Sequence, residues 1–184
     1  VIKLYYAAYQ SILFGLIDEN EYESILKKKV SVTEKRQMLD DLLRKAQHRI
    51  IHDARKNNTL YYNQIAEFAK ARPHSVSITT TNYTAFAEGL TGISGENMAY
   101  VHGRLDLFED LNTKRIGSLT DFDEEDFIFP FIFVQSGVKP IVNGYEIHEF
   151  EKAANMIAKS DELIILGYGI NSDDEHITNL IRSR

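Results

Sequence analysis

Apolar residues recur every three or four positions through much of the first third of the chain. Six of them would share one face of a helix: Leu39, Leu42, Leu43, Ala46, Ile50 and Ala54. Ser31 and Glu34 have the spacing of a capping box at the start of this helix, and Asn57 and Asn58 mark its end. A second amphipathic helix carries Leu60, Ile65, Phe68 and Ala69. The pattern predicts a helical region over residues 1–71.

The pattern changes after Arg72, where short β-branched or apolar runs begin. Four segments are predicted as strands: 75–81 (SVSITTT), 98–102 (MAYVH), 138–143 and 162–166 (ELIIL). The last is almost uninterrupted in its apolar character, which is typical of parallel strands buried on both faces. A helix over 146–159 precedes it, with Phe150, Ala153, Ala154 and Ile157 on one side. This alternation predicts an α/β fold with a doubly wound, Rossmann-like parallel sheet and an N-terminal helical layer.

Residues 105–135 do not fit this alternation. They combine an acidic run at 121–126 (DFDEED) with an aromatic cluster at 127–133 (FIFPFIF). We expect an insertion or lobe within a single domain of 184 residues. The aromatic cluster is either part of the core, which its density favours, or an exposed contact patch of a structural or interaction domain.

Composition and charge narrow the class of protein. The 21 basic and 27 acidic side chains give a net charge of -6, so nucleic acid is not an expected partner. The absence of cysteine excludes disulfides and thiolate zinc sites and fits the reducing cytoplasm. We expect no membrane span, because no apolar run reaches about 18 residues. The chain opens without methionine inside an apolar segment, so we expect a fragment of a longer protein.

Three polar clusters follow the predicted strands, where open parallel sheets bind their ligands. They are TTNYT at 80–84, HGRLD at 102–106 and GYGINSDDEH at 167–176. In the first, four side chains would face a ligand: Thr80, Thr81, Asn82 and Thr84. The alternative is that Asn82 and Thr84 only cap the helix that follows.

His102 is the candidate catalytic residue of the second cluster. It ends a predicted strand, and Gly103 after it would let the chain turn and a ligand approach the backbone. A histidine exchanges a proton near neutral pH, as activation of a sugar hydroxyl requires. The alternative is a structural histidine that only makes hydrogen bonds.

The histidines show no convergent metal-ligand spacing. His48 and His52 are four residues apart but have no third ligand nearby, and the consecutive residues 173–176 cannot all converge on one ion. We therefore expect no metal site and a protein that folds without zinc.

The third cluster begins with Gly167 and Gly169, which would permit close passage of a nucleotide. Acidic side chains such as Asp174 can accept hydrogen bonds from ribose hydroxyls. The alternative is a plain turn in which Ser172 or Asp173 is the N-cap of the following helix.

Together the clusters resemble the sirtuin-like family in order and spacing. Four segments carry the resemblance: Thr80–Thr84 for the Thr-Gln-Asn-Ile-Asp motif, His102–Gly103 for the catalytic His-Gly pair, Lys139–Pro140 through Glu146 for the Arg-Pro segment, and Gly167–Gly169 for the last turn. The Thr-Thr-Asn-Tyr form is similar to the divergent bacterial type, several members of which destroy NAD in antiphage defence. The resemblance covers about residues 75–184.

The resemblance implies an NAD-hydrolysing domain that releases nicotinamide. His102 would be the general base, and Asn82 would position water or ribose. The residues implied to contact the nucleotide are Thr80, Thr81, Thr84, Gly103, Gly167, Gly169, Asn171 and Asp174. The alternative is a non-catalytic module that senses NAD or ADP-ribose. The sequence leaves open whether the parent protein forms a homo-oligomer.

The chain also departs from the family pattern. The family's glycine-rich phosphate loop would lie upstream of Val1, so we expect weak or no NAD binding and no activity from this fragment. Thr84 replaces the motif's aspartate, whose negative charge a hydroxyl cannot supply. The zinc-binding cysteines of deacylating sirtuins are absent, which argues against a deacylase.

Overall fold

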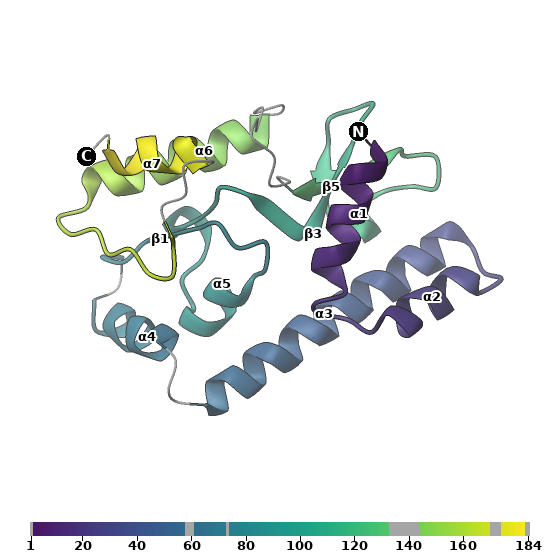
Figure 1. Cartoon of the computed structure of the whole chain (residues 1–184), viewed down its shortest axis with the longest axis horizontal. Helices are drawn as coiled ribbons and strands as arrows, with labels where there is room; N and C mark the ends of the chain where they lie inside the picture. Colours follow the sequence, from purple (N-terminus) through teal and green to yellow (C-terminus); the bar gives the residue numbers. More distant parts are fainter. Residues whose placement is uncertain (1, 58–60, 73, 133–143, 170–173, 183–184) are drawn as a thin grey trace.

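A computed structural model describes residues 2–57, 61–72, 74–132, 144–169 and 174–182 (Figure 1). The helices in these ranges are α1 (Ile2–Leu13), α2 (Glu19–Lys27), α3 (Val32–Lys56), α4 (Tyr61–Ala71), α5 (Phe86–Thr91), α6 (Gly144–Lys159) and α7 (Glu175–Arg182), with short 3-10 turns at Gly95–Asn97 and Leu119–Asp121. The strands are β1 (Ile78–Thr80), β2 (Met98–Tyr100), β3 (Gly103–Asp110), β4 (Ile116–Gly117) and β5 (Ile128–Ile132).

The predicted helical region is confirmed as α1 to α4. The capping box at the start of α3 is present, because the Glu34 N–H donates to the Ser31 hydroxyl and the Ser31 N–H donates to the Glu34 carboxylate. Asn57 is the C-cap of α3, as predicted. Local periodicity and capping chemistry were therefore sufficient to place these helices.

The first three helices share a hydrophobic core with the antiparallel sheet. Tyr9 and Leu13 of α1 and Leu43 of α3 pack with Leu105 and Phe108 of β3. Leu105 is fully buried, and the Tyr9 and Phe108 rings meet edge to face at 5.8 Å. The segment expected as a lobe therefore packs against the helical region and completes its core.

The strands form two small sheets. β1 and β2 pair in parallel, with Ile78 opposite Met98 and Thr80 opposite Tyr100, whereas β3 pairs antiparallel with β4 on one side and β5 on the other. The α/β class and the strands near 75–81 and 98–102 are confirmed in a shorter form. A doubly wound sheet is not established by these two parallel strands.

The predicted buried strand at 162–166 is wrong. These residues follow an irregular path, and Ile164 is 68% exposed. The Val101 N–H donates to Thr80 of β1, whereas the Tyr100 N–H, which faces the other way, donates to the Glu149 carboxylate of α6 at 2.7 Å. Because Glu149 takes this backbone donor, α6 occupies the β2 edge on which another parallel strand would pair. The strand predicted at 138–143 lies outside the described residues.

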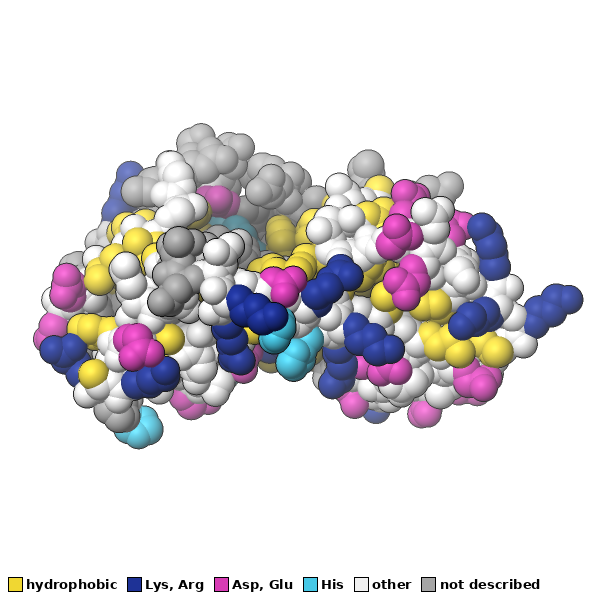
Figure 2. All heavy atoms as spheres, turned by 90° about the horizontal axis from the view of Figure 1, so that it is seen from below, with side chains coloured by type: hydrophobic (Ala, Val, Ile, Leu, Met, Phe, Trp, Pro, Cys, Tyr) yellow, Lys and Arg dark blue, Asp and Glu magenta, His cyan; other side chains and the backbone are white. Residues whose placement is uncertain are grey.

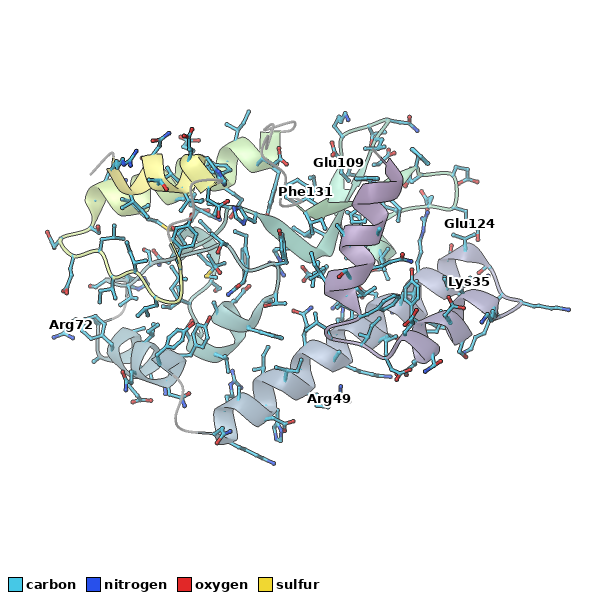
Figure 3. All side chains as sticks on the ribbon, viewed as in Figure 1. Lys35, Arg49, Arg72, Glu109, Glu124 and Phe131 are labelled. Atoms are coloured by element: carbon cyan, nitrogen blue, oxygen red, sulfur yellow. The ribbon has the colours of Figure 1, made fainter. Side chains whose placement is uncertain are left out.

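The aromatic cluster at 127–133 is divided between core and surface. Phe131 and Ile132 of β5 are buried, as its density favoured, whereas Phe127 is 55% exposed. Phe131 lies at the end of β5 nearest α6 (Figure 3), and its ring meets that of Tyr145 edge to face at 5.3 Å. This contact joins the antiparallel sheet to α6, which is the predicted helix over 146–159 and begins at Gly144.

The surface carries charges of both signs. Figure 2 shows Lys and Arg side chains intermixed with Asp and Glu across the face viewed from below. At the α2–α3 end, Lys35 donates to the Leu26 carbonyl, and Glu124 accepts from Thr33 at the start of α3 (Figure 3). Within the described ranges, no helix combines the length and apolar character of a membrane span.

Candidate functional site

The first two polar clusters meet at one edge of the parallel sheet. Thr80 and Tyr100 are register partners at the carboxyl ends of β1 and β2, and the Val101 N–H donates to the Thr80 carbonyl at 3.1 Å. The chain turns at Val101 and His102 and enters β3 at Gly103. His102 therefore lies at the junction of the two sheets, beyond the strand ends where the sequence placed the site.

The third cluster reaches the same point through the start of α7. His102 is 4% exposed, and its Nε2 lies 3.0 Å from Nε2 of His176 and 3.9 Å from Oδ1 of Asp174. The two imidazole rings are 5.2 Å apart between centroids. The structure thus brings together two imidazoles and one carboxylate from segments 74 residues apart.

Packing of α7 explains why these side chains face His102. Ile177 is buried against Ala99 and Val101, at the end of β2, and against Ala153 of α6. Leu180 and Ile181 recur three and four residues later and pack against the same cluster. This apolar stripe docks α7 and carries the preceding residue, His176, to the site.

Aromatic rings border the two histidines. The Tyr83 ring lies 6.3 Å from that of His102, and the Phe150 ring meets that of His176 edge to face at 5.6 Å. Burial and, after it, the nearby Asp174 carboxylate raise the pKa of the Tyr168 hydroxyl. His102 and His176 therefore lie among aromatic rings and largely away from water, where interactions between charges are stronger than in open water.

This arrangement permits two kinds of chemistry. Two Nε2 atoms at 3.0 Å can form a hydrogen bond only when one carries a proton and the other accepts it. The Asp174 carboxylate favours positive charge at this point, either a proton held by the imidazoles or a cation. Such a group can move a proton to and from a ligand, or it can ligate a metal ion.

The sequence predicted that the small size of Gly103 lets a ligand approach the backbone. In the structure a neighbouring strand approaches it. The Gly103 φ of +82 lies in the region that favours glycine, and a Cβ there would meet the Phe131 carbonyl oxygen and lie 3.0 Å from the Ile132 Cα. The group that approaches this glycine closely is the backbone of β5. The approach of this strand is sufficient to require glycine here, and contact of Gly103 with a ligand stays a prediction.

The contacts described for Asn82 do not include the histidine pair. Asn82 is exposed, and its backbone N–H donates to the Thr80 hydroxyl at 3.1 Å. Its side chain faces Tyr62 of α4, where burial raises the pKa of the phenol and the hydrogen bond from Asn82 opposes that rise. Asn82 thus contacts Tyr62 of α4 and Thr80 within its own turn.

The alternative that Asn82 and Thr84 cap the next helix is not realised. α5 begins at Phe86 after the N-cap Ala85, which has no side-chain cap, and the Ala85 N–H donates to Gln47 of α3. Thr81 and Thr84 are half-buried near the start of this helix.

The predicted glycines of the third cluster lie on the surface. Gly167 and Gly169 are exposed, and Gly167 has a φ of +64. A Cβ at either position would have no neighbour within 4 Å. Asn171 lies outside the described residues.

A charged cluster of Arg104, Asp106 and Glu88 follows the turn at His102, and the sequence analysis did not predict it. Arg104 binds Asp106 through two hydrogen bonds of 2.8 and 2.6 Å, lies 3.7 Å from Glu88, and stacks 4.8 Å above the Tyr100 ring. Burial acts to lower the pKa of Arg104, but Asp106, together with Tyr100 and Glu88, outweighs it and the net shift is upward. The group ties α5, β2 and β3 together and so steadies the turn at His102.

The sequence predicted that the histidines do not converge, and this is wrong for His102 and His176, whose Nε2 atoms are 3.0 Å apart. No local pattern links residues this far apart, so only the docking of α7 reveals the pair. The expected absence of zinc stays a prediction.

No known family model, curated protein or solved structure matches this chain. The resemblance to sirtuin-like proteins therefore rests on the short motifs alone.

Proposed function

We propose that the His102 site belongs to an NAD-binding unit that hydrolyses the bond between nicotinamide and ribose. The observation that carries the proposal is a buried imidazole at the shared carboxyl end of β1 and β2, with the His176 imidazole 3.0 Å away. The order of the motifs along the chain supports the choice of NAD. One member of each polar cluster, Thr80, His102 and His176, lies at the strand ends, where open sheets bind nucleotides.

In this reaction His102 acts as a general base toward a ribose hydroxyl. The bond between the ribose carbon and nicotinamide breaks, its electron pair leaves with nicotinamide, and a water oxygen bonds to the ribose carbon. One proton of that water stays on the new ribose hydroxyl, and the other goes to solvent through the imidazole pair. The proton that His102 takes from the neighbouring ribose hydroxyl returns to that oxygen once nicotinamide has left. Asp174, 3.9 Å from the His102 Nε2, stabilises the positive charge while the pair holds the proton.

The decisive assay is chromatography of NAD incubated with the longest natural form of the protein that contains this sequence. Nicotinamide release is expected, and His102→Ala should reduce it about a hundredfold to ten-thousandfold, the usual effect of losing a general base. His148→Ala, on the exposed side of α6, is the matched control and should retain activity. Circular dichroism verifies that each variant is folded. Equal turnover by wild type and His102→Ala contradicts the assignment, as does no release by the wild type.

A second candidate is a non-catalytic sensor of NAD or ADP-ribose. Thr84 favours it, because the half-buried hydroxyl carries no negative charge to place near the cationic nicotinamide ring. Calorimetric titration separates the two candidates. Saturable binding of NAD without nicotinamide release identifies a sensor, whereas binding with release identifies the hydrolase.

A further inference from the structure

We propose that His102, Asp174 and His176 form a binding site for a divalent first-row transition-metal ion of the zinc class. One ligand atom from each residue lies within 4.8 Å of the other two. The proposal goes beyond the NAD chemistry and does not depend on it. It rests on the side chains that α7 brings to the end of β2.

The separations between ligand atoms are close to those of a metal site. Nitrogen ligands about 2.0–2.1 Å from zinc are about 3.3 Å apart in a tetrahedron and about 2.9 Å apart at adjacent octahedral positions. The two Nε2 atoms are 3.0 Å apart, and the His102 Nε2 is 3.9 Å from the Asp174 carboxylate. The two imidazole nitrogens are thus already at the spacing of ligands, whereas the Asp174 carboxylate, which lies within 4.8 Å of both, has to move closer to complete the site.

The types of ligand select the class of ion. Imidazole nitrogen suits zinc, copper, nickel and iron, whereas magnesium and calcium prefer all-oxygen sites. The chain has no cysteine, so thiolate cannot shift the preference toward softer ions. Three protein ligands leave at least one coordination position for water, as in catalytic rather than structural zinc sites.

The surrounding fold holds the ligands in place and leaves access for an ion. His102 is fixed in the turn between β2 and β3, and His176 is held by the ring of Phe150 and by burial of the adjacent Ile177. The side chain of Asp174 is 15% exposed. Part of the Asp174 side chain therefore faces solvent, from which an ion would approach the site.

Metal binding here is separate from folding. The described hydrophobic clusters are built from aliphatic and aromatic side chains, and none of the three proposed ligands belongs to them. The expectation that the protein folds without zinc is thus compatible with reversible binding afterwards. If the proposed hydrolysis is correct, a bound ion occupies the lone pair of His102 and inhibits it.

The test is isothermal titration of the tag-free 184-residue protein with Zn²⁺ after removal of metal by a chelator. One Zn²⁺ per chain is expected. His176→Gln and Asp174→Asn should each weaken binding more than about tenfold, because even second-sphere partners of a ligand typically contribute 10- to 100-fold. His148→Gln removes an exposed histidine of α6 and should leave the affinity unchanged.

Titration with Co²⁺, followed by its visible absorption, gives a second measurement that reports the ligand geometry directly. The spectrum of a nitrogen and oxygen site should appear in wild type and be lost in His176→Gln. No Zn²⁺ binding, or equal weakening by His148→Gln and His176→Gln, overturns the proposal. Neither measurement involves NAD, so failure of the proposed hydrolysis leaves this test intact.

Discussion

Replacing Gly103 by alanine tests why a glycine must follow His102. A non-glycine residue in the left-handed region costs about 1–2 kcal/mol. The added Cβ would also meet two backbone atoms of β5, the Phe131 carbonyl oxygen and the Ile132 Cα. Backbone atoms cannot rotate aside, so the strand must shift, and overpacking of this kind costs about 1–3 kcal/mol. The expected loss of unfolding free energy is therefore about 2–5 kcal/mol.

Gly92→Ala is the matched control, because it carries the conformational cost without the clash. Gly92 ends α5 with a φ of +76, and a Cβ there would have no neighbour within 4 Å. We expect this variant to lose only about 1–2 kcal/mol. The difference between the two variants then isolates the approach of β5.

Urea unfolding at equilibrium, followed by circular dichroism, measures both losses under one condition. Gly103→Ala should lower the midpoint more than Gly92→Ala, with the slope unchanged. Equal losses in the two variants would refute the argument that β5 requires this glycine.

Two further predictions concern the helical region. Arg36→Ala should destabilise the protein by about 2–3 kcal/mol in urea unfolding, because buried Arg36 donates to the Phe122, Asp123 and Asp126 carbonyls. Arg49→Ala, at an exposed position of the same helix (Figure 3), should change stability by less than about 0.5 kcal/mol; similar losses would contradict this role. Hydrogen bonds from the Ser31 backbone and hydroxyl lower the pKa of Glu34 below its ordinary 4.5, so its stabilising effect is present above that pH and lost as pH falls through the lowered pKa. The difference in Tm between wild type and Glu34→Gln should therefore shrink from about pH 6 to about pH 3, and a difference that stays constant would argue against the capping role.

Helices and capping were predictable because their causes are local. The repeat of apolar residues that ends at Ala54 and the Ser31–Glu34 pair act within a few residues, and the structure contains both as predicted. The segments of β1 and β2 were also recognisable, since β-branched and apolar runs are bounded by turns. Their parallel pairing then explains why the clusters at Thr80 and His102 meet.

The sequence by itself thus determined the α/β class, the N-terminal helices and the sheet edge at which polar side chains gather. Only the tertiary structure decided that residues 162–166 form no strand and leave Ile164, Ile165 and Leu166 exposed, and that Glu149 of α6 takes the backbone donor at the β2 edge. Only the tertiary structure brings His176 to His102, because the apolar stripe of α7 packs against residues of β2 and α6 that are far away in sequence. Apolar periodicity reports which face of an element is buried, whereas the partner of that face depends on which edges and surfaces other elements have already covered.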